Sequence, residues 1–448
     1  MKKFKSVCLL LALIVAVCCL STVFSAYTKY DETVIVYNWE DYIYSKSDLQ
    51  NDFNEYYKAK TGKTCKVQYS TFDTNETMLN KLLNSNTKVD LICPSEYAIQ
   101  KLLDNGKLQK IDQANISTMS NVNPEIYSKV REVYADYKVN GVNTDITEYF
   151  VPYMMGTLGI LYNADVVKQA DIDCGWGLLW NKNNNPDLKG KIFMKDSIRD
   201  SYAAAVLYLK EEGRLPAGYE TKSVEALIND TSEVMLKAVE TVLKEQKESG
   251  CLKGYEVDFG KQEMITKKVL VDLAWSGDAM YAIEEAKAVG VNLDYFVPES
   301  GGNIWFDGWV IPTVAKNVKA ANCMIEFLNQ PEIAAKNMLE IGYTSAVDKT
   351  VLAADAKVEQ LLAENEYDKT EFFAYEVRYP DYSDDTLGVM KDFGDRNAAV
   401  TTMWEGILGS DTDLTVLWVI VGIVAAGGAA FGIAYAVKHN KRKVVKKK

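Results

Sequence analysis

Short apolar runs alternate with helical patterns along most of this chain, and this alternation constrains the fold more than any other feature. The runs 34–37 (VIVY), 66–69 (KVQY) and 89–92 (VDLI) have the length and residue types of strands. Between the last two runs, apolar residues recur at helical spacing after Asp73 and Glu76, which resemble a capping box. Strand, helix and strand in this order predict a parallel α/β sheet.

The length of the central region indicates more than one core. Residues 27–413 lie between two apolar segments, and about 390 residues exceed what one hydrophobic core usually organises. Further strands are predicted at 159–162, 269–274 and 293–297, and 303–309 is predicted to cross from one lobe to the other. We therefore expect a two-lobed α/β domain.

The two ends of the chain predict targeting and a membrane anchor. Residues 1–26 combine a basic start, an apolar run and small residues, which is typical of a signal peptide or N-terminal anchor. Residues 414–437 are 24 residues without charge, long enough to span a bilayer as a helix. The tail 438–448 carries seven basic residues and is expected in the cytoplasm, which places the domain 27–413 outside.

Composition excludes several classes of function for the central domain. It holds 40 basic and 62 acidic residues, a net charge of −22 that attracts cations and repels nucleic acid. The chain's one histidine, His439, lies in the basic tail, so histidine-based nucleophilic catalysis and histidine-ligated metal are excluded from the domain. Its five cysteines match no metal motif, and the chain has no P-loop. No catalytic residue, metal or cofactor is predicted.

Aromatic and acidic residues cluster where predicted strands end. Ligands of open α/β sheets bind beyond the carboxyl ends of the strands, so these positions are candidate binding residues. The clusters are 38–42 (NWEDY), 94–97 (PSEY) and 275–278 (WSGD), with a fourth at 305–307 (WFD). Their recurrence at strand ends favours a binding site over isolated core aromatics.

These stretches, in this order, resemble the spermidine/putrescine-binding proteins of polyamine importers. The resemblance covers nearly all of 33–405, and its most specific segments are 37–43 (YNWEDYI), 70–78 (STFDTNETM), 93–112 (CPSEYAIQKLLDNGKLQKID), 151–163 (VPYMMGTLGILYN), 196–200 (DSIRD), 274–279 (AWSGDA), 301–312 (GGNIWFDGWVIP) and 341–346 (IGYTSA). The resemblance implies a two-lobed periplasmic-binding-protein-like fold (type II), with ligand in a cleft between the lobes and crossovers near 151–160 and 300–312.

The resemblance also implies a set of ligand-binding residues. They are Trp39, Glu40, Tyr42, Ser95, Tyr97, Asp200, Trp275, Trp305, Asp307 and Tyr343. Trp305 and Asp307 match the pair that grips the polyamine centrally, and Asp200 occupies the place of an acid for a terminal amine. Three positions depart from the family. Ser197 stands where some members carry a second acid, and Glu40 stands where others carry Thr. Met390 lies near a position where some members carry Gln.

The residue types suit a polyamine, whose ammonium groups need carboxylates and whose methylenes need aromatic faces. We therefore expect a non-enzymatic, extracytoplasmic protein that captures spermidine or putrescine for the permease and ATPase of an ABC importer. The preferred polyamine stays open. Two alternatives are a membrane-tethered polyamine sensor and, more remotely, a glycan hydrolase using paired carboxylates.

Overall fold

The computed structural model describes residues 30–85, 87–381 and 385–409, and these form two compact units. Unit 1 comprises residues up to 156 and those from 305 to 381, and unit 2 comprises 157–304 and 385–409. The chain passes from one unit to the other within two long strands, β7 (Phe150–Asn163) and β12 (Gly302–Pro312).

Unit 1 contains a parallel sheet with β1 (Glu32–Trp39) flanked by β2 (Cys65–Phe72) and β3 (Leu91–Ile92). Parallel neighbours need a crossover connection, and helices α2 (Lys46–Thr61) and α3 (Asn75–Asn84) supply the two crossovers. Beyond β3, the strand β12 joins the sheet in the antiparallel direction. The predicted strand–helix–strand pattern is therefore present.

The start of α3 differs in detail from the capping box expected at Asp73 and Glu76. Thr74 is the N-cap, and its Oγ1 accepts a hydrogen bond from the Thr77 N–H at 3.2 Å. A threonine hydroxyl satisfies one of the free amides of the first helical turn as an Asp73 carboxylate would. The apolar face is formed as predicted, with Met78 and Leu82 buried.

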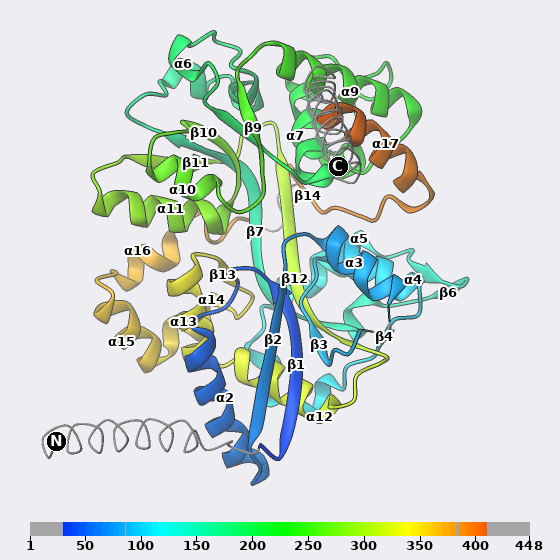
Figure 1. Cartoon of the computed structure of the whole chain (residues 1–448), viewed down its shortest axis with the longest axis vertical. Helices are drawn as coiled ribbons and strands as arrows, with labels where there is room; N and C mark the ends of the chain where they lie inside the picture. Colours follow the sequence, from blue (N-terminus) through cyan, green and yellow to red (C-terminus); the bar gives the residue numbers. More distant parts are fainter. Residues whose placement is uncertain (1–29, 86, 382–384, 410–448) are drawn as a thin grey trace, which may run out of the picture. The chain divides into compact units, whose positions relative to one another are not determined.

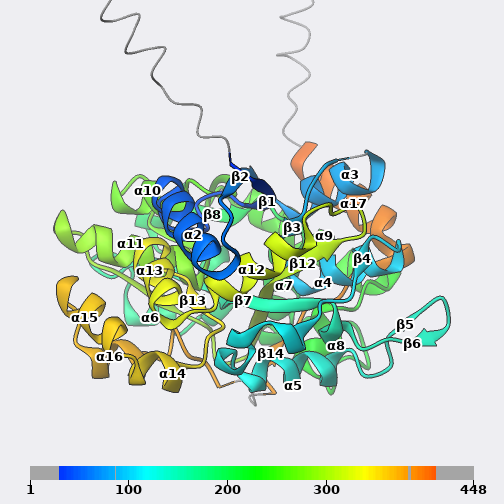
Figure 2. The same ribbon diagram turned by 90° about the horizontal axis from the view of Figure 1, so that it is seen from below.

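Further elements complete unit 1. They are α4 (Glu96–Asp104), β4 (Leu108–Gln109), η1 (Gln113–Asn115), η2 (Ser117–Asn121), α5 (Pro124–Val133), β5 (Lys138–Val139), β6 (Val142–Asn143), η3 (Ile146–Glu148), α12 (Val318–Leu328), α13 (Pro331–Ile341), β13 (Thr344–Ser345), α14 (Lys349–Ala354), α15 (Ala356–Glu364) and α16 (Lys369–Ala374). Helices α13 to α16 gather around a small apolar core of their own (Figure 1). The β5–β6 hairpin projects from the rest of unit 1 in both views (Figures 1 and 2).

Unit 2 contains the strands of the 12-stranded sheet that follow the later part of β7. Strand β10 (Val271–Trp275) pairs with β7 in the antiparallel direction, and β8 (Ile192–Lys195) and β9 (Leu252–Glu256) follow in parallel. On its other side, β7 pairs with β11 (Leu293–Phe296). The remaining elements are α6 (Gln169–Ile172), η4 (Gly175–Trp180), η5 (Pro186–Leu188), α7 (Ile198–Glu211), α8 (Val224–Ile228), α9 (Glu233–Glu248), α10 (Gly260–Ile265), α11 (Ser276–Ala288), β14 (Leu387–Gly388), η6 (Gly394–Arg396) and α17 (Asn397–Leu408).

The prediction of a membrane-spanning helix at 414–437 is corrected. No helix in the described part of the chain is both long and apolar enough to cross a membrane. The longest, α2 and α9, have 16 residues each and carry charged side chains. At 1.5 Å per residue such a helix is about 24 Å long, shorter than a hydrocarbon core of about 30 Å. The segments 414–437, 1–26 and 438–448 lie outside the described residues, and the membrane helix is not retained.

Candidate functional site

Four of the aromatic residues singled out from the sequence form one group in unit 1. The ring of Tyr42 lies 4.8 Å from that of Tyr343 and 6.4 Å from that of Trp39, measured between centroids. Trp305 lies 5.7 Å from Tyr343. The rings meet edge-on or tilted, as aromatic pairs prefer. Residues from the end of β1, from β12 and from the segment after α13 thus share one aromatic surface.

Two residues with left-handed backbone place these tyrosines. Asp41 has φ of +47°, so the chain turns sharply after β1 and brings Tyr42 back toward the sheet. Aspartate tolerates this conformation better than most residues. Gly342 has φ of +80° and ends α13, with its N–H bonded to the Met338 carbonyl at 3.0 Å. Tyr343 follows at once, so a glycine helix end sets its position.

Asp307 joins the aromatic group through a hydrogen bond. The hydroxyl of Tyr42 donates to Asp307 Oδ2 at 2.7 Å. Burial, and then the negative charge of Asp307, raise the pKa of Tyr42 well above its usual value, so the phenol keeps its proton and stays a donor. The Tyr42 carbonyl accepts from the Tyr153 hydroxyl at 3.0 Å, which fixes the loop. A neutral donor orients the carboxylate without cancelling its charge.

Ser95 and Tyr97 come from the start of α4 in the same unit. Ser95 pairs with Asp307 in an isolated β-bridge, so its backbone lies directly beside that of the acid. The Asn75 side chain donates to Ser95 Oγ at 2.9 Å and anchors the segment on α3. The Tyr97 hydroxyl donates to Glu76 Oε1 at 3.2 Å. Ser95 is therefore adjacent to Asp307, whereas the Tyr97 hydroxyl is directed to α3.

Glu40 behaves differently from its neighbours in the sequence. Its side chain is 47 % exposed and faces Lys46 across 3.9 Å. An exposed ion pair at that distance contributes little. The structure places Glu40 at the surface, with Lys46 as its partner.

In unit 2, the two predicted residues also lie together. Trp275 ends β10 and Asp200 lies in the first turn of α7, and the indole Nε1 donates to Asp200 Oδ1 at 3.3 Å. Burial raises the pKa of Asp200, while hydrogen bonds from Ser197 and Trp275 and the nearby positive charge of Lys195 act against that rise. The Trp275 indole therefore orients this carboxylate.

A buried lysine beside Trp275 was missed by the sequence reasoning. The side chain of Lys195 is 1 % exposed, and its Nζ lies 4.5 Å from the centroid of the Trp275 ring. The same ammonium forms an ion pair with Glu256 and donates to the Val257 carbonyl at 2.9 Å. A lysine at the end of the apolar run 192–195 (IFMK) was the available signal, because a charge ending a buried strand needs a partner.

More acids surround this ion pair. Asp272 is 1 % exposed, and burial together with the charge of Glu256 raises its pKa well above the usual value. A Cβ at position 260 would lie 2.4 Å from Asp272 Oδ2, so any larger residue there would displace this carboxylate. The Gly260 N–H instead donates to Glu256 Oε2 at 2.7 Å. Among the described residues, no group of three or more His, Cys, Asp or Glu is arranged to hold a metal ion.

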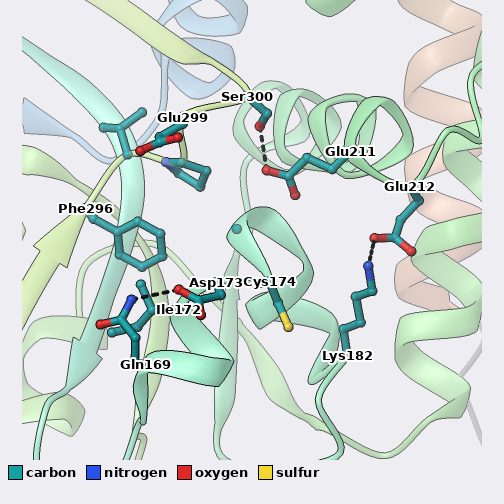
Figure 3. Close-up of a pocket in the computed structure, with 13 residues that line it drawn as sticks. Gln169, Ile172, Asp173, Cys174, Lys182, Glu211, Glu212, Phe296, Glu299 and Ser300 are labelled. Atoms are coloured by element: carbon teal, nitrogen blue, oxygen red, sulfur yellow. Dashed lines mark hydrogen bonds and ion pairs between the residues drawn. The ribbon is translucent and has the colours of Figure 1, made fainter.

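Unit 2 also has a pocket of about 600 Å³ that contains none of the predicted ligand residues (Figure 3). Its walls combine apolar side chains such as Phe296 with several acids. Three of these acids are engaged by the protein itself. Glu211 accepts from Ser300, Glu212 pairs with Lys182, and Asp173 accepts from Gln169. We do not assign the predicted binding function to this pocket.

Comparison with known proteins identifies the family. Residues 52–364 match the model of the family described as "Bacterial extracellular solute-binding protein". The spermidine/putrescine-binding periplasmic protein of Escherichia coli is 28 % identical over 71 % of this chain and 79 % of its own length. The putrescine-binding periplasmic protein SpuD of Pseudomonas aeruginosa is 30 % identical over 67 % of this chain and 74 % of its own. These matches confirm the resemblance found in the sequence.

Solved structures agree with the sequence comparisons. A putative spermidine/putrescine ABC transporter protein from Listeria monocytogenes is 28 % identical, with a TM-score of 0.63, over 84 % of this chain and 98 % of that one. The spermidine/putrescine ABC transporter substrate-binding protein from Streptococcus pneumoniae is 27 % identical, with a TM-score of 0.60 and the same coverage. The predicted two-lobed α/β periplasmic-binding-protein-like fold is thereby confirmed. The chain belongs to the bacterial extracellular solute-binding proteins, a family of binding proteins rather than enzymes.

Proposed function

We propose that this protein captures a polyamine outside the cytoplasm and delivers it to an ABC importer. The observation that carries the proposal is the group in unit 1, where the rings of Tyr42, Tyr343 and Trp305 pack in sequence and the Tyr42 hydroxyl bonds the carboxylate of Asp307. Relatives that match over more than two thirds of this chain are spermidine/putrescine-binding and putrescine-binding proteins. The chemistry of the group supports the same class of ligand.

An acid held among aromatic rings suits an alkylammonium ion. The carboxylate replaces the water that the ammonium loses, and two charges 4 Å apart attract by about 4 kcal/mol at an effective dielectric constant of 20. Ring faces cover the methylenes and attract the cation by about 0.5–2 kcal/mol each. Because Tyr42 is a neutral partner, it holds Asp307 in place without supplying a competing positive charge.

We assign roles to the candidate residues on this basis. In unit 1, Asp307 receives an ammonium and the aromatic group covers the methylenes. In unit 2, Asp200 receives a second ammonium and Trp275 offers the ring beside it. The remaining proposed contacts outside the aromatic group are Glu40, Ser95 and Tyr97, of which Glu40 is the most peripheral because it is exposed and faces Lys46.

Titration calorimetry of the purified protein tests the ligand class. Putrescine, spermidine and spermine are titrated separately, with 1,4-butanediol as a control that keeps the chain length of putrescine and lacks its charges. We expect at least one polyamine to bind more than about 100-fold more tightly than the diol, which corresponds to about 2.7 kcal/mol. Equal binding of diol and polyamine, or no binding of any polyamine, contradicts the proposal.

The importer partners are tested by reconstitution. We propose a permease and an ATPase as partners, because relatives with solved structures are described as parts of ABC transporters. Addition of the polyamine-loaded protein to vesicles holding its cognate transporter should stimulate ATP hydrolysis, and the ligand-free protein should do so less. Equal stimulation with and without ligand would argue against delivery.

A further inference from the structure

The segment before α4 follows the strand β12 and then turns away from it. The Gly308 N–H donates to the Pro94 carbonyl at 3.0 Å, and Ser95 is paired with Asp307 in a β-bridge. Helix α4 begins at the next residue, Glu96. Because the Glu96 backbone enters the helix, a side chain must replace the backbone as the next partner for β12.

The side chain of Glu96 supplies that partner. Its Oε2 accepts a hydrogen bond from the Phe306 N–H at 2.9 Å, and Glu96 as a whole is 1 % exposed. Phe306 lies between Trp305 and Asp307, the two β12 residues to which we assign ligand contacts. One buried carboxylate therefore holds the backbone of the residue that joins them.

A carboxylate suits this position for two reasons. Hydrogen bonds from a backbone N–H to an ionised acid are shorter and stronger than those to a neutral acceptor. Glu96 is also the first residue of α4, a helix of nine residues, where a negative charge is favoured by the free amides of the first turn. The segment is anchored on its other side, since the Ser95 N–H donates to Asn75 Oδ1 at 3.3 Å.

We infer that Glu96 is a positioning residue of the polyamine site, which sets Trp305 and Asp307 through the backbone of Phe306. The inference rests on the proposed function for its effect on binding. Glu96 itself is not assigned a contact with the ligand. Its role is to continue the hydrogen bonding of β12 at the point where α4 leaves the strand.

Two substitutions of Glu96 distinguish a role in positioning β12 from an effect of its negative charge. Glu96→Ala removes the acceptor, whereas Glu96→Gln removes the charge and keeps an oxygen that can accept from Phe306. Glu125→Ala is the matched control, because Glu125 is an exposed acid in the first turn of α5, another helix of unit 1. The probe is spermidine, measured by calorimetry, and the ligand-free readout is hydrogen exchange at the Phe306 amide.

We expect Glu96→Ala to weaken spermidine binding by about 10- to 100-fold, because a small misplacement of binding groups is costly. Exchange at Phe306 should accelerate by at least about tenfold, since the amide loses its acceptor. Glu96→Gln should stay within about fivefold of wild type in both measurements, and Glu125→Ala should match wild type. Rescue by Gln is the result that a general loss of stability would not give.

Other outcomes decide against the inference. Wild-type exchange at Phe306 in Glu96→Ala overturns it, as does a Glu96→Gln variant that is as impaired as Glu96→Ala. If Glu96→Ala does not fold, the Glu96→Gln variant provides the test. Spermidine binding and Phe306 exchange within about fivefold of wild type support the inference, and larger changes contradict it. If the wild-type protein binds no polyamine, the proposed function fails, while amide exchange in the three variants still tests whether Glu96 positions β12.

Discussion

The two units present their candidate ligand residues in different electrostatic settings. In unit 1, Asp307 is held by a neutral phenol, that of Tyr42, within a group of aromatic rings. In unit 2, the ring of Trp275 already has an ammonium over it, that of Lys195, at 4.5 Å. Both units combine an acid with aromatic residues, and in unit 2 the chain places its own buried cation, that of Lys195, on the ring.

This difference separates the expected roles of the two units. A cation over one face of an indole uses part of the attraction that the ring offers to a second cation. We therefore expect Trp275 to act mainly as an apolar surface, with Asp200 as the charged partner in unit 2. We expect unit 1, where the neutral phenol of Tyr42 holds Asp307, to contribute the larger share of the binding free energy.

The largest effect is expected from removing the buried cation of unit 2. Lys195→Met leaves Glu256, whose side chain is fully buried, without its ion-pair partner and beside Asp272. Breaking one partner of a buried pair costs about 3–5 kcal/mol of stability. Denaturant unfolding of the variant, followed by hydrogen exchange in β8 and β10, measures this loss.

A double variant provides the control for that measurement. Lys195→Met with Glu256→Gln removes both charges, so at least half of the lost stability should return. If the single variant is as stable as wild type, Lys195 is not the structural cation described here and the contrast between the units weakens.

The second effect concerns the acid of unit 1. Asp307→Asn keeps the shape of the side chain and removes its charge, so a polyamine ammonium would face a neutral amide. The expected loss of binding is about 2–4 kcal/mol, or roughly 30- to 1,000-fold in dissociation constant. Calorimetry measures the loss, and the melting temperature without ligand should barely change. Binding within threefold of wild type would falsify the role of Asp307.

The sequence predicted where strands occur better than it predicted where they begin and end. The run 34–37 lies within β1 and 66–69 within β2, because alternating and β-branched residues follow the buried faces of these strands. The run 89–92 is reduced to β3 at Leu91–Ile92, and 159–162 is one part of the 14-residue strand β7. Local pattern predicts that a strand exists, whereas its length depends on which neighbours pair with it.

The residues of the candidate site were also predictable only in part. Trp39, Tyr42, Trp305 and Asp307 could be found because each follows or lies in an apolar run, and the structure brings them together. The ion pair between Lys195 and Glu256 could not be predicted, because the two residues are 61 positions apart and neither belongs to a recognisable motif. Side-chain partners of buried charges are set by tertiary packing, which a single sequence does not reveal.

A smaller effect is expected from the acid of unit 2. Asp200→Asn removes the carboxylate that Trp275 orients, but burial already raises the pKa of Asp200 and Lys195 places a positive charge nearby. We expect a loss of about 1–2 kcal/mol, or roughly 5- to 30-fold in the dissociation constant of a polyamine. Competition calorimetry on Asp200→Asn and Asp307→Asn, measured in parallel, tests which variant loses more binding free energy. A greater loss in Asp200→Asn than in Asp307→Asn would reverse the comparison.

The smallest effect concerns stability and pH in unit 2. Burial, and then the charge of Asp278, raise the pKa of Asp258 to about 6, with Glu256 adding to the rise and Lys195 and Lys261 opposing it. The folded protein therefore binds more protons than the unfolded chain between about pH 4 and pH 6. This group consequently lowers stability as the pH rises through that range, and the loss persists at higher pH.

Asp258→Asn removes the titrating group, so the variant should be more stable than wild type above pH 6 and equal to it near pH 4. The rise in the pKa of Asp258 from its ordinary 3.8 to about 6 corresponds to roughly 2–3 kcal/mol, which partial exposure of the side chain reduces to about 1 kcal/mol. Melting temperatures of both proteins at pH 4 and pH 7.5 measure the difference, with Asp187→Asn, an exposed acid of unit 2, as control. An equal gain at both pH values would show that the effect comes from packing, because only the charged carboxylate should be penalised by the buried acids around it.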